Sequence, residues 1–471
     1  MSQPAQDKPA GPAHAPWTIA ALLALSLALM AIPTPQGLPE PGQRVLAVAV
    51  LAIGLWCTEA LPAAVTAVVV IVALVLSGGV TSIQEGLIGF ADPVVYFLMG
   101  VLTIGLAVSR SGLAERVARV FLRRSKGSAR SLYVQLLLSF PLLTLLLPSA
   151  TTRTGILVHV YEQALELAKV PRRAPLAQAV MLALSGLNRL ASTVILTGGI
   201  TPVVAAGLIG GIAWSQWLLL MSVPYLALLV LGAILLYWLH RRGFEVKLPP
   251  PEEREATPLS ACELRTAIIT VGASLLWLTD ALHHWHPAMP ALLAWIFLLM
   301  PRIGVLTWQE FERDIGWTNF FVVASSLSLA RALASSGASE WIAGLIVAAV
   351  PQFRDQPVLV IAILMAASVP VRLLIPNITG FLATSIPIAM SIGAACGVNP
   401  MICGLAVMIA GDAVLYYPAQ SVSSLVVYEK GYLTAPEIFR FGVWMTVLAF
   451  FVVLAIALPY WGALGESLRV L

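Results

Sequence analysis

The chain has 471 residues, of which 59% are hydrophobic and 11% are charged, and its mean hydropathy is +0.90. Soluble domains carry about 25% charged residues, so this composition excludes a soluble globular protein and indicates an all-α integral membrane protein. The formal charge of +4 is spread over short connections, which leaves no basic face for nucleic acid.

The apolar segments predict about eleven membrane-spanning helices, because one span needs about 20 mostly apolar residues. Residues 1–16 are polar and precede a first helix that we expect to be retained. In chain order the predicted helices are 17–33, 44–58, 62–78, 93–110, 175–197, 213–240, 263–282, 287–301, 318–336, 401–418 and 438–463. Two pairs of shorter segments predict re-entrant hairpins, 131–147 with 154–168 and 357–375 with 380–395.

Basic residues set the expected orientation in the membrane. If both pairs leave on the side where they enter, all basic clusters fall on one face, which the positive-inside tendency makes cytoplasmic. We therefore expect a multi-pass protein of the inner (plasma) membrane with its N-terminus in the cytoplasm and its C-terminus outside. The clusters span residues 110–130, 169–173, 241–254, 302–313 and 430–440.

Two halves of the chain resemble each other. SGLAERVARV at 111–120 is similar to SGASEWIAGL at 336–345, and PSAT at 148–151 is similar to PNIT at 376–379. In the expected topology the first hairpin enters from inside and the second from outside, so the halves form an inverted repeat. Inverted repeats with interrupted helices that meet near the membrane midplane are typical of secondary transporters.

The centres of the paired segments carry the first candidate site residues. At a hairpin tip a new helix presents free N–H donors and a positive dipole end to an anion, while the ending helix offers carbonyl oxygens to a cation. Ser149, Thr151, Asn377 and Thr379 add donors and acceptors without bulk. This combination suits a small carboxylate or oxyanion beside a sodium ion; packing of small polar residues between helices is the alternative.

Each half has a second interruption that could face its tip. In STVILTGGITP at 192–202 the glycines Gly198 and Gly199 permit unwinding, and in YYPAQSVSS at 416–424 Pro418 breaks the helix. The candidates that could line the site, or instead pack or cap the helix break, are Thr197, Thr201, Gln420 and Ser421.

Ionisable residues at membrane depth are costly and usually functional. Arg153, Arg189, Arg372 and Asp412 lie in apolar segments. Asp412 could bind a cation, carry a proton or pair with a buried arginine. Arg153 needs a partner, which could be the substrate, Asp412, or water and carbonyl groups at the cytoplasmic mouth. The four cysteines lack metal-ligand spacing, and we expect no cofactor.

The order of these features resembles the divalent-anion:sodium symporter family, also called solute carrier family 13. The resemblance rests on WCTEALPAAVTAVVV at 56–70, FADPVVYFLMG at 90–100 and SRSGLAERVA at 109–118, and on both hairpins. It implies an eleven-helix homodimer with two re-entrant hairpins, in which a transport domain moves like an elevator against a dimerising scaffold. It also implies di- and tricarboxylates or sulfate as substrates and sodium as the coupling ion.

The hairpin signature of that family is Ser-Asn-Thr, once per tip. Here the first copy reads Ser149-Ala150-Thr151, and the second reads Asn377-Ile378-Thr379, or Pro376-Asn377-Ile378 if shifted by one residue. The predicted substrate contacts are Ser149, Ala150, Thr151, Arg153, Thr197, Asn377, Thr379, Gln420 and Ser421. The predicted sodium ligands are Ser149, Gly198, Asn377 and Ala419.

The sequence thus predicts a secondary active transporter, not an enzyme, that moves a small anion of the di- or tricarboxylate, sulfonate or sulfate class with sodium. The rivals are a sodium-independent anion exchanger or a proton-coupled symporter, and more distantly a non-transporting membrane sensor. Because a fixed cation and a sodium ion would repel in low dielectric, we hypothesise that Arg153 replaces the sodium of the first half. The expected partners are the anion, sodium, membrane lipid and a second copy.

The predicted division of the chain follows from this fold. It comprises a polar tail at 1–16, scaffold helices and the start of the first repeat at 17–110, and the first hairpin and broken helix of the transport domain at 111–212. Scaffold helices and a cytoplasmic linker follow at 213–317, and the second repeat with the second hairpin and broken helix at 318–471.

Overall fold

The computed structural model of the protein describes residues 15–58, 60–125, 127–147, 149–246, 258–349, 356–375 and 377–469. Within these ranges all regular structure is helical and there is no strand, apart from an isolated bridge between Val398 and Arg469. The prediction of an all-α protein is therefore confirmed. Seven helices of the described ranges are long and apolar enough to cross a membrane, and six apolar helices are shorter, so the count of eleven spans stays a prediction. Residues 1–14 of the predicted tail lie outside the described residues.

The first part of the chain contains the first helix pair and the first broken helix. Its elements are α1 (Ala15–Ala31), α2 (Glu40–Thr58), α3 (Ala63–Leu76), α4 (Ile83–Gly86), η1 (Ile88–Ala91), α5 (Pro93–Ser111), α6 (Leu113–Arg123), α7 (Ala129–Leu146), α8 (Ala150–Leu167), α9 (Pro175–Leu182), the π-helix η2 (Ala183–Leu187), α10 (Asn188–Thr193), η3 (Leu196–Gly198), α11 (Ile200–Ile209), α12 (Trp214–Leu239) and η4 (Arg241–Glu245).

The second part of the chain contains the second helix pair and the second broken helix. Its elements are α13 (Ala261–Leu278), α14 (Asp280–His283), α15 (Ala288–Leu299), α16 (Trp308–Asp314), α17 (Trp317–Ser335), α18 (Ala338–Ala349), α19 (Pro357–Leu374), α20 (Ile378–Ala395), α21 (Pro400–Asp412), η6 (Pro418–Gln420), α22 (Val422–Glu429), α23 (Ala435–Val452), the π-helix η7 (Val453–Ala457) and α24 (Leu458–Ala463).

Helix boundaries follow local cap chemistry. The Asp92 side chain accepts a hydrogen bond from the Val94 N–H at 3.0 Å and is followed by Pro93, so α5 begins with two favoured start residues. Gly112 has a φ of +81° and separates α5 from α6, a left-handed position that suits glycine. Capping boxes start α13, α16 and α23 at Ser260, Thr307 and Thr434.

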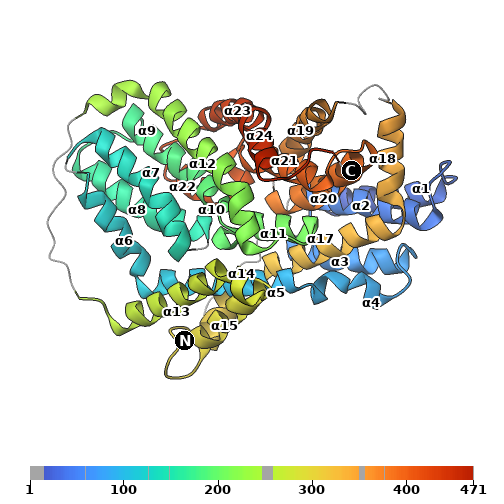
Figure 1. Cartoon of the computed structure of the whole chain (residues 1–471), viewed down its shortest axis with the longest axis horizontal. Helices are drawn as coiled ribbons and strands as arrows, with labels where there is room; N and C mark the ends of the chain where they lie inside the picture. The colour runs from blue at the N-terminus through green and yellow to red at the C-terminus, as the bar shows by residue number, and fades with distance from the viewer. Residues whose placement is uncertain are drawn as a thin grey trace.

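The predicted paired segments are helix pairs joined by three residues. The first pair is α7 with α8, and the second is α19 with α20. Figure 1 shows α7 and α8 at the left and α19 and α20 at the right, with α10, α11 and α21 between them. The tip prolines Pro148 and Pro376 lie outside the described residues. Re-entry into the membrane and the inverted repeat stay predictions.

The two predicted helix breaks are present. After α10 the chain is extended at Ile195 and Gly199, with one turn of 3-10 helix between them. Gly198 is held against Ser192, because a Cβ on Gly198 would lie 2.0 Å from the Ser192 carbonyl oxygen. The second break runs from the end of α21 at Asp412 to the start of α22.

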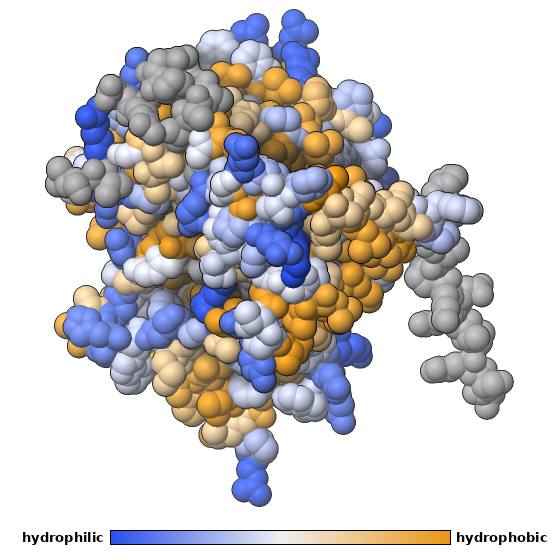
Figure 2. All heavy atoms as spheres, turned by 90° about the vertical axis from the view of Figure 1, so that its right-hand side faces the viewer, coloured by the Kyte–Doolittle hydropathy of each residue, from blue (hydrophilic) through white to orange (hydrophobic). Residues whose placement is uncertain are grey.

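The exterior of the molecule is largely apolar. Figure 2 shows broad hydrophobic areas on one face, interrupted by hydrophilic side chains. On α3 the outward-facing side chains are Val65, Val68, Val72 and Leu76, which are 46%, 47%, 45% and 82% exposed. Exposed apolar surface of this extent is what a lipid-facing exterior requires.

Candidate functional site

Both helix tips begin with polar residues that the sequence singled out. Ser149 precedes α8, and its hydroxyl accepts hydrogen bonds from the Thr152 backbone N–H at 3.3 Å and from the Thr152 hydroxyl at 3.0 Å. Asn377 precedes α20, and its side-chain oxygen accepts the Thr379 N–H at 2.9 Å. Both residues are N-caps. The remaining N–H groups of the two first turns and the positive ends of the helix dipoles therefore lie at the tips.

Arg153 lies in the first turn of α8 and is fully buried. Its Nε donates to Asn188 Oδ1 at 2.7 Å, its Nη1 to the Leu147 carbonyl at 2.8 Å, and its Nη2 to the Asn188 carbonyl at 2.9 Å and to the Ser192 hydroxyl. Asn188 in turn donates to the Ala150 carbonyl at 3.2 Å. Three kinds of partner were expected for Arg153. In the structure it contacts carbonyl groups, and these belong to the first tip and to α10.

Arg372 holds the second tip in a similar way. It lies near the end of α19, is fully buried, and donates from Nη1 to the Ile375 carbonyl at 2.7 Å and from Nε to the Gly411 carbonyl at 3.1 Å. Its guanidinium carbon also lies 5.8 Å from the centre of the Phe381 ring in α20, within the range of a cation–π contact.

The two arginines therefore cap equivalent carbonyl groups. Leu147 and Ile375 each precede the tip proline, and proline has no N–H to donate. The last carbonyl groups of a helix need donors from elsewhere when they are buried. At both tips a guanidinium supplies them.

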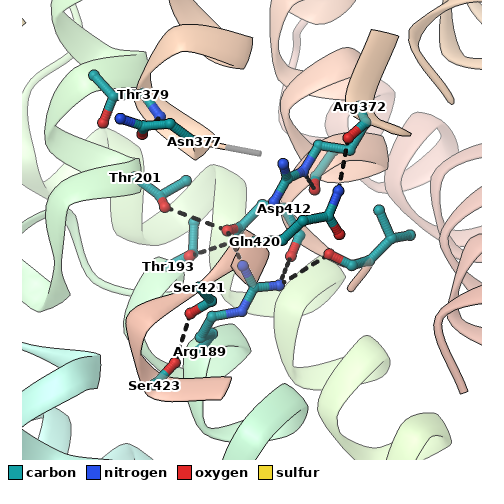
Figure 3. Close-up of polar contacts among 12 residues, drawn as sticks. Arg189, Thr193, Thr201, Arg372, Asn377, Thr379, Asp412, Gln420, Ser421 and Ser423 are labelled. Carbon is teal, nitrogen blue, oxygen red and sulfur yellow. Dashed lines mark hydrogen bonds and ion pairs between the residues drawn. The ribbon is translucent and has the colours of Figure 1, made fainter. Parts of the chain in front are cut away.

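Asp412 pairs with Arg189 between the two tips. The Arg189 Nη1 lies 3.9 Å from Asp412 Oδ1, and the Arg189 Nη2 donates to the Asp412 and Val414 carbonyl groups at 2.6 and 3.2 Å. The Asp412 carboxylate also accepts hydrogen bonds from the hydroxyl groups of Thr193 at 2.7 Å and of Thr201 at 3.2 Å. Figure 3 shows this network with Asn377 and Thr379 beside Thr201. Of the roles expected for Asp412, pairing with a buried arginine is the one the structure contains.

The second break is fixed by Gln420. Its side-chain Nε2 donates to the Arg372 carbonyl at 2.7 Å, and its Oε1 accepts the Tyr416 N–H at 2.7 Å. The Ser421 hydroxyl lies 2.7 Å from the Ser423 hydroxyl. Both hydrogen-bonding groups of Gln420 are therefore used within the protein. The amide nitrogen binds the second hairpin (Figure 3), and the amide oxygen stays within the break.

The other predicted residues differ in their access to solvent. Thr151 and Ala419 are exposed, Ala150 is half-buried, and Gly198 is buried inside the first break. Thr197 is 7% exposed, and its hydroxyl lies 3.4 Å from the indole nitrogen of Trp214. The structure thus brings the tips and breaks together through side-chain contacts, while the roles in substrate and sodium binding stay predictions.

Sequence reasoning missed several polar residues that connect these parts: Asn188, Ser192, Thr193 and Tyr225. Asn188 binds Arg153, Ala150 and the Thr154 hydroxyl, and Tyr225 donates to Asp412 at 3.2 Å. A signal for Asn188 was present, since it stands beside Arg189 in an otherwise apolar helix. The helical spacing alone does not reveal its partners.

The centre between the tips carries a positive excess. Among the described side chains it holds the three buried guanidinium groups of Arg153, Arg189 and Arg372, against the one carboxylate of Asp412. Burial of a cation without a counter-charge is costly. A site with this balance favours an anion as its occupant.

An all-α fold with apolar spans, interrupted helices and a buried polar centre is consistent with a membrane transporter. The sequence matches the sodium:sulfate symporter transmembrane region over residues 13–466, so the chain belongs to this divalent anion:Na⁺ symporter family. It is 22% identical to a citrate/succinate antiporter of Escherichia coli (strain K12), over 94% of this chain and 97% of that one. It is also 22% identical to the sodium-dependent dicarboxylate transporter SdcS of Staphylococcus saprophyticus, over 90% and 86% of the two chains.

Solved structures share the fold at low sequence identity. The YdaH transporter of Alcanivorax borkumensis superposes with a TM-score of 0.57 at 13% identity, over 92% of this chain and all of that one. MtrF of Neisseria gonorrhoeae gives a TM-score of 0.56 at 13% identity, over 93% and 96% of the two chains. These likenesses concern the fold alone.

Proposed function

We propose that the protein is a secondary active transporter, and not an enzyme, for a small anion of the di- or tricarboxylate class. One observation carries this proposal: two capped helix N-termini and three buried guanidinium groups are linked from tip to tip through α10 and α21. The names of the relatives, a citrate/succinate antiporter and a dicarboxylate transporter, support carboxylates. Sulfonates and sulfate are the other classes to test.

The substrate would lie between the tips. Ser149, Ala150 and Thr151 would contact it from the first tip, and Asn377 and Thr379 from the second. Thr197, Gln420 and Ser421 would line it from the two breaks. Arg153 and Arg372 would act through the positive potential that they supply, because their guanidinium groups donate to oxygen atoms of the protein.

The coupling mode that this geometry supports best is sodium-independent anion exchange. At each tip a guanidinium donates to the last carbonyl oxygen before the proline, beside the residues that would bind a sodium ion. Two unit charges 4 Å apart repel by about 4 kcal/mol at an effective dielectric constant of 20, so a sodium ion beside either arginine would be disfavoured. We therefore extend the replacement hypothesis for Arg153 to Arg372 in the second half.

Fixed positive charges also favour exchange over net uptake. A sodium ion leaves the carrier after release, whereas an arginine stays. An empty site that crossed the membrane would carry its excess of two positive charges through the membrane potential. The free-energy cost of this movement is about 2.3 kcal/mol per charge per 100 mV. A bound dianion cancels this excess. The moving part of the protein would therefore cross the membrane with an anion bound, both inward and outward.

Sodium-coupled symport is the second candidate. It is favoured by the half-buried Asn377, whose amide oxygen accepts one hydrogen bond and keeps a second lone pair. In this case Ser149, Gly198, Asn377 and Ala419 would be the ligands. Proton coupling is less supported, because Asp412 is already engaged by Arg189 and by three hydroxyl groups.

The setting of the transporter belongs to the same proposal. We place it in the inner membrane with the N-terminus inside, as a homodimer surrounded by lipid, with an elevator movement of the hairpin-bearing part. Apart from one bond from Ser215 to Asp280 of α14, the side-chain hydrogen bonds that join α12 to other helices go to α7, α10, η3, α21 and α24. We therefore group α12, which falls in the predicted scaffold segment 213–317, with the moving part.

Counterflow in proteoliposomes tests the function. Vesicles loaded with unlabelled citrate or succinate should accumulate the labelled anion from outside, with the same rate in sodium and choline chloride. Empty vesicles should take up little. Counterflow that requires sodium would favour symport, and absence of counterflow with every carboxylate, sulfonate and sulfate tried would favour a sensor.

A further inference from the structure

The helices fall into two groups that share few polar contacts. We call α7–α12 with α19–α24 the hairpin block, and α1–α5 with α13–α18 the flanking block. Between described residues of the two blocks, one hydrogen bond is present and no ion pair: the Ser215 N–H donates to Asp280 Oδ2 at 3.0 Å. The other hydrogen bonds between described residues of the two blocks stay within a block or go to the connecting helix α6 and its C-cap.

The rest of the interface consists of close apolar packing. The hairpin block places α11 against α5 and α20 against α17 and α18. A Cβ on Gly207 of α11 would lie 2.8 Å from Val94 Cγ1 of α5, and a Cβ on Gly380 of α20 would lie 3.7 Å from the indole of Trp56. Contacts of this kind have no direction, so one block can slide past the other without breaking hydrogen bonds.

The contact between Ser215 and Asp280 is well placed to resist such sliding. Ser215 is the second residue of α12, a helix of 26 residues whose own N-cap residue, Ala213, offers no side-chain acceptor. Asp280, 65 positions further along the chain and in the other block, supplies that acceptor. A carboxylate at a helix N-terminus is favoured by the unpaired N–H groups and by the helix dipole.

The environment of Asp280 points to a role beyond packing. Its side chain is 7% exposed, and its second oxygen, Oδ1, is buried and has no hydrogen-bond partner among the described groups. A buried carboxylate oxygen without a donor is costly. One carboxylate oxygen of Asp280 therefore makes a favourable contact, while the burial of the other oxygen is unfavourable. We expect this balance for a contact that must form and break.

We propose that Asp280 is a latch between the two blocks, which holds the hairpin block in the position seen here and releases it when the α12 N-terminus moves away. The proposal rests on the elevator movement proposed above. A hydrogen bond to a charged group contributes enough to change an equilibrium by roughly ten- to hundred-fold. Removal of the carboxylate should lower the population of the present position by that factor.

Spin-label distances between α12 and α13 measure this population. The labels are placed at Leu226 and Leu275, which are 41% and 56% exposed, in a background without the four native cysteines. Asp280→Ala should shift the distance distribution away from the wild-type position. Asp280→Asn should shift it less, because an amide oxygen still accepts the N–H. Asp314→Asn is the matched control, since Asp314 binds Arg110 and Arg313 inside the flanking block, and it should leave the distribution unchanged.

Hydrogen exchange separates failure of the latch from failure of the elevator. In Asp280→Ala the amides of the first turn of α12 should exchange at least about tenfold faster than in the wild type, since they lose their acceptor. If wild type shows one distance under all conditions and exchange is faster in the variant, the bond is real but the elevator, and with it the latch, is wrong. Unchanged exchange, or an unchanged distribution in a protein that samples two distances, overturns the latch while leaving the transport proposal standing.

Discussion

Replacement of Arg153 by alanine should create a sodium response that the wild type lacks. The guanidinium donates to four oxygen atoms, namely the Leu147 and Asn188 carbonyl oxygens, Asn188 Oδ1 and Ser192 Oγ. In Arg153→Ala all four lose this donor at once. Converging neutral oxygens are the ligands that a hard cation takes, and the deleted side chain leaves room for the ion.

The magnitude follows from these contacts. Each buried oxygen left without its donor costs about 1–3 kcal/mol, although removal of a buried charge returns part of that loss. Without sodium the variant should therefore unfold at a lower temperature than the wild type. An ion that binds only the folded protein restores about 2.7 kcal/mol at 100 times its Kd, which for a chain of this length is a recovery of roughly 3 °C.

Thermal unfolding in detergent measures both effects. Sodium chloride is titrated against choline chloride at constant ionic strength, so that only the specific ion changes. The matched control is Arg124→Ala, which removes an exposed arginine that lies against the Phe121 ring. Its Tm should not respond to sodium.

Two results would refute the reasoning. The first is a sodium-dependent rise in Tm of the wild type that equals or exceeds that of Arg153→Ala. The second comes from transport: a wild type that needs two or more sodium ions, by Hill coefficient and charge movement, with unchanged coupling in Arg153→Ala. Either result would return Arg153 to a purely structural role at the first tip.

Three further perturbations test other parts of the site. Thr151→Val and Thr379→Val should each weaken substrate affinity roughly ten- to hundred-fold, because a hydrogen bond to a charged group contributes about 1.5–3 kcal/mol; unchanged KM values in counterflow would remove these residues from the site. Asp412→Asn should lower the unfolding free energy by about 3–5 kcal/mol, because it leaves Arg189 without its counter-charge. The double variant Arg189→Met, Asp412→Leu should lose less stability than the sum of the losses in Arg189→Met and Asp412→Leu alone. Additive losses would contradict the pairing. A disulfide between Val94→Cys and Gly207→Cys, whose Cβ positions are 3.2 Å apart, should abolish transport and keep one-sided binding; full transport in the crosslinked protein would contradict the elevator.

Local chemistry made much of the fold predictable from the sequence. The helix pairs and both breaks follow from apolar runs interrupted by proline, glycine and small polar residues, and the structure contains them within a few residues of the expected positions. Ser149 and Asn377 were recognisable as helix-start residues because an N-cap acts on the amides that follow it directly.

Long-range packing decides the part that was not predictable. The sequence marks Arg153 and Arg189 as costly, but Arg153 finds Asn188 after 35 positions and Arg189 finds Asp412 after 223. The same limit applies to the start of α12, where no neighbouring residue caps the helix and the acceptor Asp280 comes from another part of the fold. Helical periodicity predicts the face of the helix on which a residue lies. It does not predict which residue of another helix that side chain contacts.

The two buried arginines show how one physical demand is met at unrelated sequence positions. Arg153 follows its tip proline by five residues, whereas Arg372 precedes its own by four, so no alignment of the two hairpins pairs them. Yet each supplies a donor to the carbonyl oxygen before the proline, and each reaches a carbonyl of the neighbouring broken helix. The buried carbonyl group before each proline needs a positively polarised partner, and a guanidinium supplies one without leaving the protein. It follows that loss of either arginine should be compensated only by another cation at the same oxygens, which is the condition that the sodium titration of Arg153→Ala examines.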